Sequence, residues 1–103
     1  MGIVETAEKF FEACEAGKGW DGCARYCTNN ASFTAEAVAL EEIKTIEGYC
    51  DWMHALYDRV SDVSYERNGF AQDKPRSVVM AFGVFKGTPI GEGAQISFST
   101  NYV

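Results

Sequence analysis

The sequence predicts an α+β fold with helices in its first half and an antiparallel sheet in its second. Apolar residues recur every three or four positions up to about residue 61, whereas β-branched and aromatic residues with a period of two dominate afterwards. A chain of 103 residues with a hydrophobic fraction of 47% has enough apolar side chains for one hydrophobic core. We therefore expect a single domain over residues 1–103.

The first predicted helix spans residues 2–16, where apolar side chains follow helical spacing, and Gly17 is a natural C-terminal stop. Asp21 is placed to cap a short second helix that ends at about Thr28. Residues 31–36 alternate in the manner of a short strand.

A third helix is expected over residues 45–61, because this segment presents a wide apolar face. Three strands follow, at residues 63–72, 76–86 and 95–103, with segments rich in glycine and proline between them. This order predicts an antiparallel meander that curves around the third helix.

The charge balance excludes two classes of partner. Nine Lys and Arg stand against fifteen Asp and Glu, for a net charge of -6, which is the wrong sign for nucleic acid and for anionic membranes. No apolar run approaches the length of a membrane span, and no basic segment followed by an apolar run opens the chain. We expect a cytoplasmic protein.

Four cysteines, at positions 14, 23, 27 and 50, lie among apolar neighbours. The three-residue gap between Cys23 and Cys27 places both sulfurs on one face of a helix, beside Trp20. We expect reduced thiols that pack in the core, without disulfides, metal or cofactor.

One degenerate pattern runs through nearly the whole chain. It consists of Phe11, Gly17, Trp20-Asp21, Tyr26, Ala31, Phe33, Glu47-Gly48, Gly87-Thr88-x-x-Gly91 and Tyr102-Val103. In this pattern the chain resembles the SnoaL-like polyketide cyclases of the nuclear transport factor 2-like superfamily, which also includes ketosteroid isomerases and limonene epoxide hydrolases. This superfamily hosts many functions on one fold.

The resemblance implies a cystatin-like fold in which three helices close one mouth of a cone-shaped, strongly curved sheet around an apolar pocket. It also implies homodimers that form through the outer face of the sheet. Members usually carry one or two further strands, so relative to them the chain is shortened at its C-terminus, Val103.

Aromatic residues make up 14% of the chain, more than a minimal core needs. We expect the cavity to bind a small apolar or cyclic molecule. Its expected wall, with the Met80–Phe82 side of its strand facing the helices, is Trp20, Tyr26, Phe33, Met53, Tyr57, Met80 and Phe82.

The resemblance implies a histidine after the Gly-Thr turn and an aspartate before the final Tyr-Val pair. In this chain those positions hold Pro89 and Asn101. Neither side chain transfers a proton near neutral pH. The usual cyclase machinery is therefore absent, while the Asn101 amide can still bind a ligand carbonyl.

Other residues offer relocated acid/base chemistry. His54 has Cys50 four residues before it and Asp58 four residues after it, which on one helix permits a Cys-His-Asp arrangement. The alternative is a solvated helix face with ion pairs. Cys50 and His54 alone are too few ligands for a tetrahedral metal site.

Isolated carboxylates are the second source of a base, as in the isomerase branch, where a tyrosine stabilises the enolate. Candidate bases are Glu36, Asp51 and Glu66, and candidate hydroxyl donors are Tyr26, Tyr49, Tyr57 and Tyr65. Surface carboxylates and tyrosines at the edge of the core are the alternative.

Three functions follow from these residues. The first is a pocket protein for an apolar or cyclic ligand. The second is a homodimeric interaction domain with a filled pocket. The third is an isomerase, cyclase or hydrolase that performs acid/base chemistry in an apolar pocket.

Overall fold

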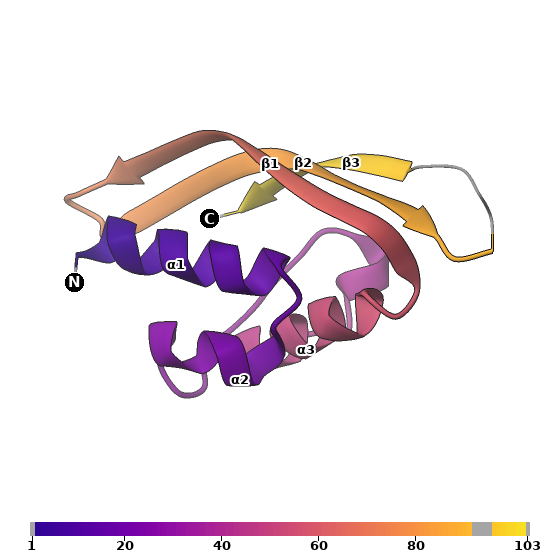
Figure 1. Ribbon diagram of the computed structural model, residues 1–103. Helices are drawn as coiled ribbons and strands as arrows, with labels where there is room; N and C mark the ends of the chain where they lie inside the picture. The colour runs from indigo at the N-terminus through magenta and orange to yellow at the C-terminus, as the bar shows by residue number, and fades with distance from the viewer. Residues whose placement is uncertain (1, 92–95, 103) are drawn as a thin grey trace. The chain divides into compact units, whose positions relative to one another are not determined.

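Helices precede strands in the computed structural model, which describes residues 2–91 and 96–102, without the side chains of residues 96 and 98–102 (Figure 1). The α+β fold class is therefore confirmed. The chain divides into two compact units, Glu8–Leu56 and Met1–Ala7 with Tyr57–Val103. Among the described residues, no helix has the length and apolarity needed to cross a bilayer.

Helix α1 (Ile3–Glu15) ends one residue before the predicted end, just ahead of the predicted stop at Gly17. The N–H of Lys18 donates to the carbonyl of Ala13 at 3.2 Å, and the N–H of Gly17 donates to the carbonyl of Cys14 at 3.0 Å. These two bonds form a Schellman motif. Gly17 has φ +73°, a left-handed conformation that glycine adopts without steric cost.

Helix α2 (Gly19–Cys23) is shorter than predicted. It continues as a 3₁₀ turn, η1 (Ala24–Tyr26), after which Cys27 is extended with φ -126° and ψ 153°. Asp21 lies inside α2 rather than at its N-cap. Cys23 and Cys27 therefore do not share one helical face, because the backbone leaves the α-helix between them.

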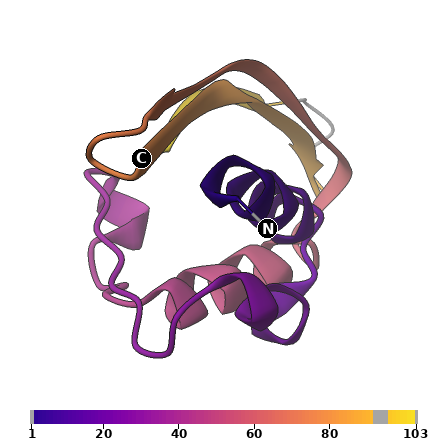
Figure 2. The ribbon, with the colours of Figure 1, turned by 90° about the vertical axis from the view of Figure 1, so that its left-hand side faces the viewer.

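Thr45 caps the N-terminus of helix α3 (Ile46–Leu56), because its Oγ1 accepts a hydrogen bond from the N–H of Gly48 at 3.1 Å. The helix ends at Leu56, five residues before the predicted end. Helix α2 packs along α3 within the unit Glu8–Leu56 (Figure 2).

The segment between η1 and α3 contains a second 3₁₀ turn, η2 (Val38–Leu40), which the sequence pattern did not reveal. The predicted strand at residues 31–36 reduces to one antiparallel bridge between Ser32 and Thr45. Two backbone bonds flank this bridge: the N–H of Phe33 donates to the carbonyl of Lys44 at 2.9 Å, and the N–H of Ile46 donates to the carbonyl of Ala31 at 3.0 Å. The alternation of this segment therefore reflects a loop fastened to the start of α3.

The strands β1 (Val60–Asp73), β2 (Val78–Pro89) and β3 (Ile96–Tyr102) form an antiparallel sheet in the order β1-β2-β3, as the predicted meander requires. In the first hairpin, Arg76 Nη1 lies 2.7 Å from Asp73 Oδ2. Strand β1 begins before the predicted position because α3 ends early and the chain turns over residues 57–59.

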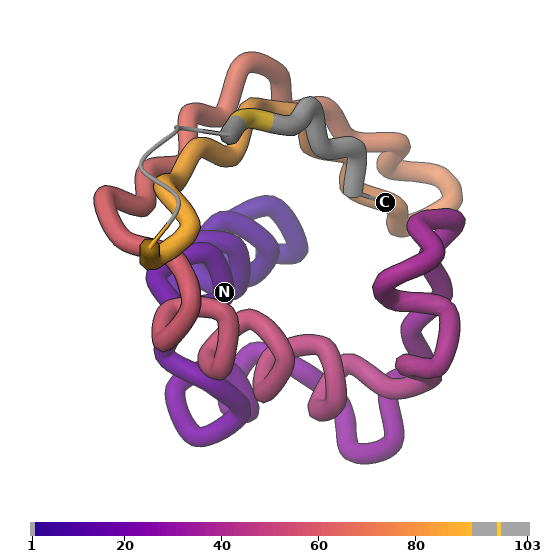
Figure 3. The backbone as a smooth tube through the Cα atoms, turned by 90° about the vertical axis from the view of Figure 1, so that its right-hand side faces the viewer, coloured from indigo at the N-terminus to yellow at the C-terminus, as the bar shows by residue number. Residues whose placement is uncertain are grey.

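The sheet bends along its strands (Figure 3). The register of β1 against β2 shifts between Ser61 and Ser64, and again between Arg67 and Gly69. Such irregularities bend a strand and increase its twist. Gly69 pairs with Phe82, and a Cβ at this glycine would overlap the Phe82 ring. The absence of a side chain thus lets the ring lie across β1.

The two faces of β2 differ in burial. Val79, Ala81 and Phe85 are buried, whereas Met80 is 41% and Phe82 is 48% exposed. The sequence predicted that the Met80–Phe82 side of the strand faces inward, and this prediction is wrong. The buried side is the opposite one, which carries Val79 and Ala81. A period of two identifies which residues share a face but does not identify which face is covered.

Substitution of Gly17 by alanine tests the turn. We expect Gly17→Ala to lower the free energy of unfolding by about 1 to 2 kcal/mol, because a Cβ opposes the left-handed conformation. Urea denaturation measures this change. Gly2→Ala is the matched control, because a Cβ there meets no atom within 4 Å. An equal loss in both variants would contradict the assignment.

Candidate functional site

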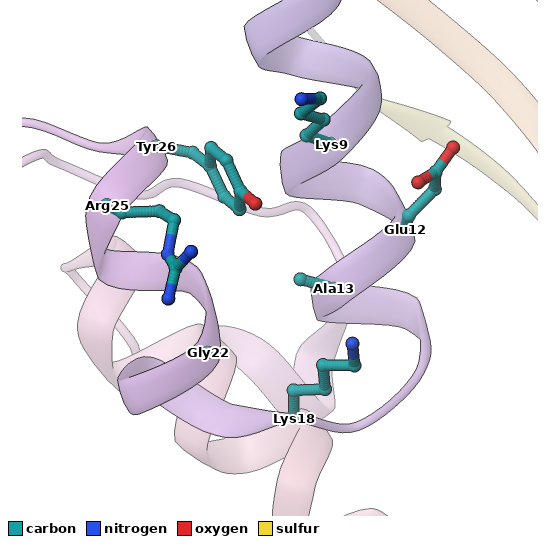
Figure 4. A pocket seen from close by; sticks show the side chains of 7 residues that line it. All are labelled: Lys9, Glu12, Ala13, Lys18, Gly22, Arg25 and Tyr26. Carbon is teal, nitrogen blue, oxygen red and sulfur yellow. The ribbon is translucent and has the colours of Figure 1, made fainter.

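A pocket of about 470 Å³ lies between α1 and the α2–η1 segment, within the unit Glu8–Leu56 (Figure 4). Its lining is polar rather than apolar, because the helix faces that meet here carry mostly charged side chains. The lining residues are Lys9, Glu12, Ala13, Lys18, Gly22, Arg25 and Tyr26.

Three cations stand against one carboxylate in this lining, although the chain has a net charge of -6. The guanidinium carbon of Arg25 lies 5.9 Å from the centroid of the Tyr26 ring. Lys9 takes part in a further interaction. The pocket combines positive charge with an aromatic face and a phenol hydroxyl.

Gly22 gives the side chain of Lys18 its place at the pocket. A Cβ at Gly22 would lie 2.6 Å from the Cβ of Lys18, closer than two carbon side chains approach. The missing side chain therefore lets Lys18 lie across α2, and Figure 4 shows its ammonium directed toward α1.

A second cluster is buried in the same unit. The sulfur atoms of Cys14, Cys23 and Cys50 all lie within 4.8 Å of one another. These residues are 1%, 0% and 0% exposed. Each comes from a different helix: α1, α2 and α3. All four cysteines are free thiols, as predicted, but Cys27 is only half-buried.

Two hydrogen bonds to α3 hold the turn that joins α1 to α2. Asp51 Oδ1 accepts from the N–H of Trp20 at 3.1 Å. His54 Nδ1 lies 2.7 Å from the carbonyl oxygen of Gly17, which only accepts, so this nitrogen donates. Gly19 has φ +73°, and a Cβ there would lie 3.4 Å from the His54 side chain.

Burial and mutual hydrogen bonding shift the thiol pKa values. Desolvation raises the pKa of Cys23 to about 12 and that of Cys27 to about 11. The hydrogen bond with Cys50 and burial raise the pKa of Cys14, while the Cys14 hydrogen bond lowers that of Cys50. Cys50 is thus the thiol that the other two stabilise as a thiolate.

The Cys-His-Asp arrangement that the sequence spacing permitted on one helix does not form. Helix α3 ends at Leu56, so Asp58 does not continue the stripe of Cys50 and His54. His54 Nδ1 bonds the carbonyl of Gly17, and the thiol of Cys50 meets those of Cys14 and Cys23. His54 therefore positions a turn in this structure.

The expected ligand-binding residues lie in both units. Tyr26 lines the observed pocket. Phe33 stacks on Tyr49 with ring centroids 4.5 Å apart, Met53 is 3% exposed, and Trp20 is half-buried.

Tyr57, Met80 and Phe82 belong to the other unit. Because Met80 and Phe82 are exposed, these two do not belong to the expected cavity wall. An apolar cavity lined by the other five residues stays a prediction. Pro89 pairs with Val60 at the end of β2. The backbone of Asn101 pairs with Phe82, but the Asn101 side chain lies outside the described residues.

Sequence reasoning missed the cations of the pocket. Each of the three cations, Lys9, Lys18 and Arg25, lies in a different segment of the sequence. No spacing rule connects isolated cations across a turn. Their only sequence signal is position: Lys18 follows a helix-stopping glycine, and Arg25 precedes Tyr26.

No protein-family model matches the chain, and a search of curated proteins gives no match. Among solved structures, the chain is similar to an uncharacterized cystatin-fold protein from Novosphingobium aromaticivorans, with 19% sequence identity and a TM-score of 0.68. The match covers 99% of this chain and 87% of that chain. The chain has a cystatin-like fold.

The raised thiol pKa values predict a loss of stability at alkaline pH. Cys23 has a folded pKa of about 12 against an ordinary value of 9.0, so the folded state holds its proton where the unfolded state has lost it. The free energy of unfolding should therefore fall as pH rises from about 9 toward 12.

Urea denaturation at pH 8 and pH 10 measures this fall, and we expect a smaller one in Cys23→Ala than in the unmodified chain. Cys27→Ala is measured for comparison, because it removes a half-buried thiol instead of a buried one. The assignment is wrong if Cys23→Ala loses as much stability between the two pH values as the unmodified chain.

Proposed function

We propose that this chain binds a small cyclic molecule that carries an anionic group, in the pocket between α1 and the α2–η1 segment. The observation that carries the proposal is that Lys18, Arg25 and Tyr26 line one pocket in an acidic protein. The cystatin-like fold and the resemblance to SnoaL-like cyclases support a small-molecule ligand. The absence of the usual His/Asp pair favours binding over cyclisation.

Each part of such a ligand has a partner in the lining. A carboxylate takes the ammonium of Lys18 and the guanidinium of Arg25, the second of which can bind both carboxylate oxygens. The cyclic, apolar part contacts the Tyr26 ring and the methyl group of Ala13. A cation at a half-open site contributes about 1 kcal/mol, or about fivefold in affinity.

The lining also limits the chemistry. Glu12 and the Tyr26 hydroxyl are its acid/base groups other than the cations. Figure 4 shows the Glu12 side chain on the side of α1 away from Tyr26. An isomerase or hydrolase mechanism with relocated residues therefore has less support than binding alone. Four free thiols fit the reducing cytoplasm that we propose as the location.

A titration with benzoate tests the proposal, with benzamide as the uncharged control. We expect benzoate to shift the backbone NMR signals of residues 9–26 in a saturable way, and benzamide to bind at least about fivefold more weakly. Arg25→Gln and Lys18→Gln should each weaken benzoate binding by about fivefold.

Lys74→Gln is the matched control variant, because Lys74 lies in the β1–β2 turn, within the other unit. It removes the same charge without touching the pocket. Equal effects of Lys74→Gln and Lys18→Gln, or equal binding of benzoate and benzamide, would reject the pocket as an anion site.

The second candidate is a homodimer that forms through the sheet, acting as an interaction domain. The observation that favours it is the exposure of Met80 and Phe82 on one face of β2. Two large apolar side chains on neighbouring positions of one sheet face lose unfavourable hydration when a second copy covers them. Exposed Phe82 also lies across Gly69, which makes that face aromatic over two strands.

Light scattering across a concentration series tests this candidate. We expect the unmodified chain to be a dimer, and Met80→Lys to dissociate it by burying a charge in the interface. Val38→Lys is the control, since Val38 is 79% exposed and belongs to η2, in the unit that does not contain the sheet. A monomeric unmodified chain, or dissociation by Val38→Lys alone, would eliminate the sheet dimer.

A further inference from the structure

We propose that Cys14, Cys23 and Cys50 form a binding site for a thiophilic metal ion of the Zn(II) or Cu(I) class. Their three sulfurs converge within 4.8 Å of one another from three different helices. Thiolates are the ligands that these soft ions prefer.

The spacing of the sulfurs is close to what a bound ion needs. A metal–sulfur distance of about 2.3 Å separates sulfurs by about 3.8 Å in a tetrahedral site and about 4.0 Å in a trigonal one. Sulfurs that already lie within 4.8 Å of one another need to approach by about 1 Å at most. A disulfide, by contrast, needs two sulfurs at about 2.05 Å and leaves the third cysteine outside.

The surrounding hydrogen bonds hold these ligands in place before an ion arrives. Asp51, the neighbour of Cys50, binds the N–H of Trp20, and His54 binds the carbonyl of Gly17. The two bonds fasten the turn between Cys14 and Cys23 to the helix that carries Cys50. Ligands on fastened helices bind a metal without the cost of ordering a loop.

A carboxyl group and a further thiol belong to the same unit as the cluster. Glu15 follows Cys14 in the sequence and is 6% exposed, so a carboxyl group is buried at the residue next to one of the ligands. Cys27 is half-buried and lies outside the group of three sulfurs. We include it in the proposal as the fourth ligand of an ion that requires tetrahedral coordination.

The alternative is that three thiols merely fill space as small apolar side chains. Such packing predicts no affinity for metal in the folded state. Binding, in turn, releases thiol protons, so the two interpretations differ in a measurable property of the unmodified chain.

Anaerobic titration of the reduced, metal-free protein with Cd(II) provides the test. We expect ultraviolet thiolate-to-metal absorption to saturate at one ion per chain. A free Cd(II) concentration about a hundredfold above Kd should raise the melting temperature by about 10 °C. No absorption, or a melting temperature that Cd(II) leaves unchanged or lowers, would overturn the proposal.

Single variants identify the ligands. Cys14→Ala and Cys23→Ala, each checked for folding by circular dichroism, should weaken Cd(II) binding at least about tenfold, whereas Cys27→Ala should keep one ion per chain. Retained binding in Cys14→Ala with loss in Cys27→Ala would assign the ion to an exposed thiol and overturn the proposal.

Cadmium NMR of the unmodified chain avoids dependence on the folding of variants. A resonance typical of three or four sulfur ligands supports the site, and one typical of nitrogen or oxygen ligands rejects it. Competition by Zn(II) and by Cu(I) then separates the two ions, because only Zn(II) should bind more weakly in Cys27→Ala. None of these measurements involves the pocket of Lys18 and Arg25, so this site and the proposed function fail independently.

Discussion

The turn between α1 and α2 is the constraint on which the arrangement of residues 8–56 depends. Gly17 reverses the chain through a left-handed conformation, and the carboxylate of Asp51 and the imidazole of His54 bond its two sides. A polar turn of this kind would otherwise leave a backbone carbonyl and an N–H group without protein partners. Helix α3 supplies both hydrogen-bond partners, Asp51 and His54, from one exposed side. These two bonds hold the turn between α1 and α2 against α3.

Both candidate sites follow from that turn. On one side it carries Lys18, which lies over Gly22 and lines the pocket together with Arg25 and Tyr26. On the other it brings Cys14 and Cys23 to Cys50. The lone histidine thus has a structural role that its spacing from Cys50 and Asp58 did not reveal. A side chain suited to catalysis serves here as a hydrogen-bond donor to backbone.

The sheet obeys a different constraint. Two register shifts in β1 bend the strands, and glycine at position 69 lets an aromatic ring cross to the neighbouring strand. The same alternation that buries Ala81 and Phe85 leaves Met80 and Phe82 exposed. Successive residues of β2 therefore point to a covered and an uncovered face in turn. The apolar side chains on the uncovered face form the surface on which the proposed dimer depends.

Periodicity and turn chemistry in the sequence determined the α+β class, the helix stop at Gly17 and the three-stranded meander, because these depend on residues close together in the chain. Local patterns did not determine the end of α3, the break after α2 or the covered face of β2, since each depends on packing between distant segments. The two sites are of that second kind. Isolated cations and single cysteines carry no spacing motif, and only the tertiary structure places Lys18 and Arg25 in one pocket lining and brings Cys14 to Cys50.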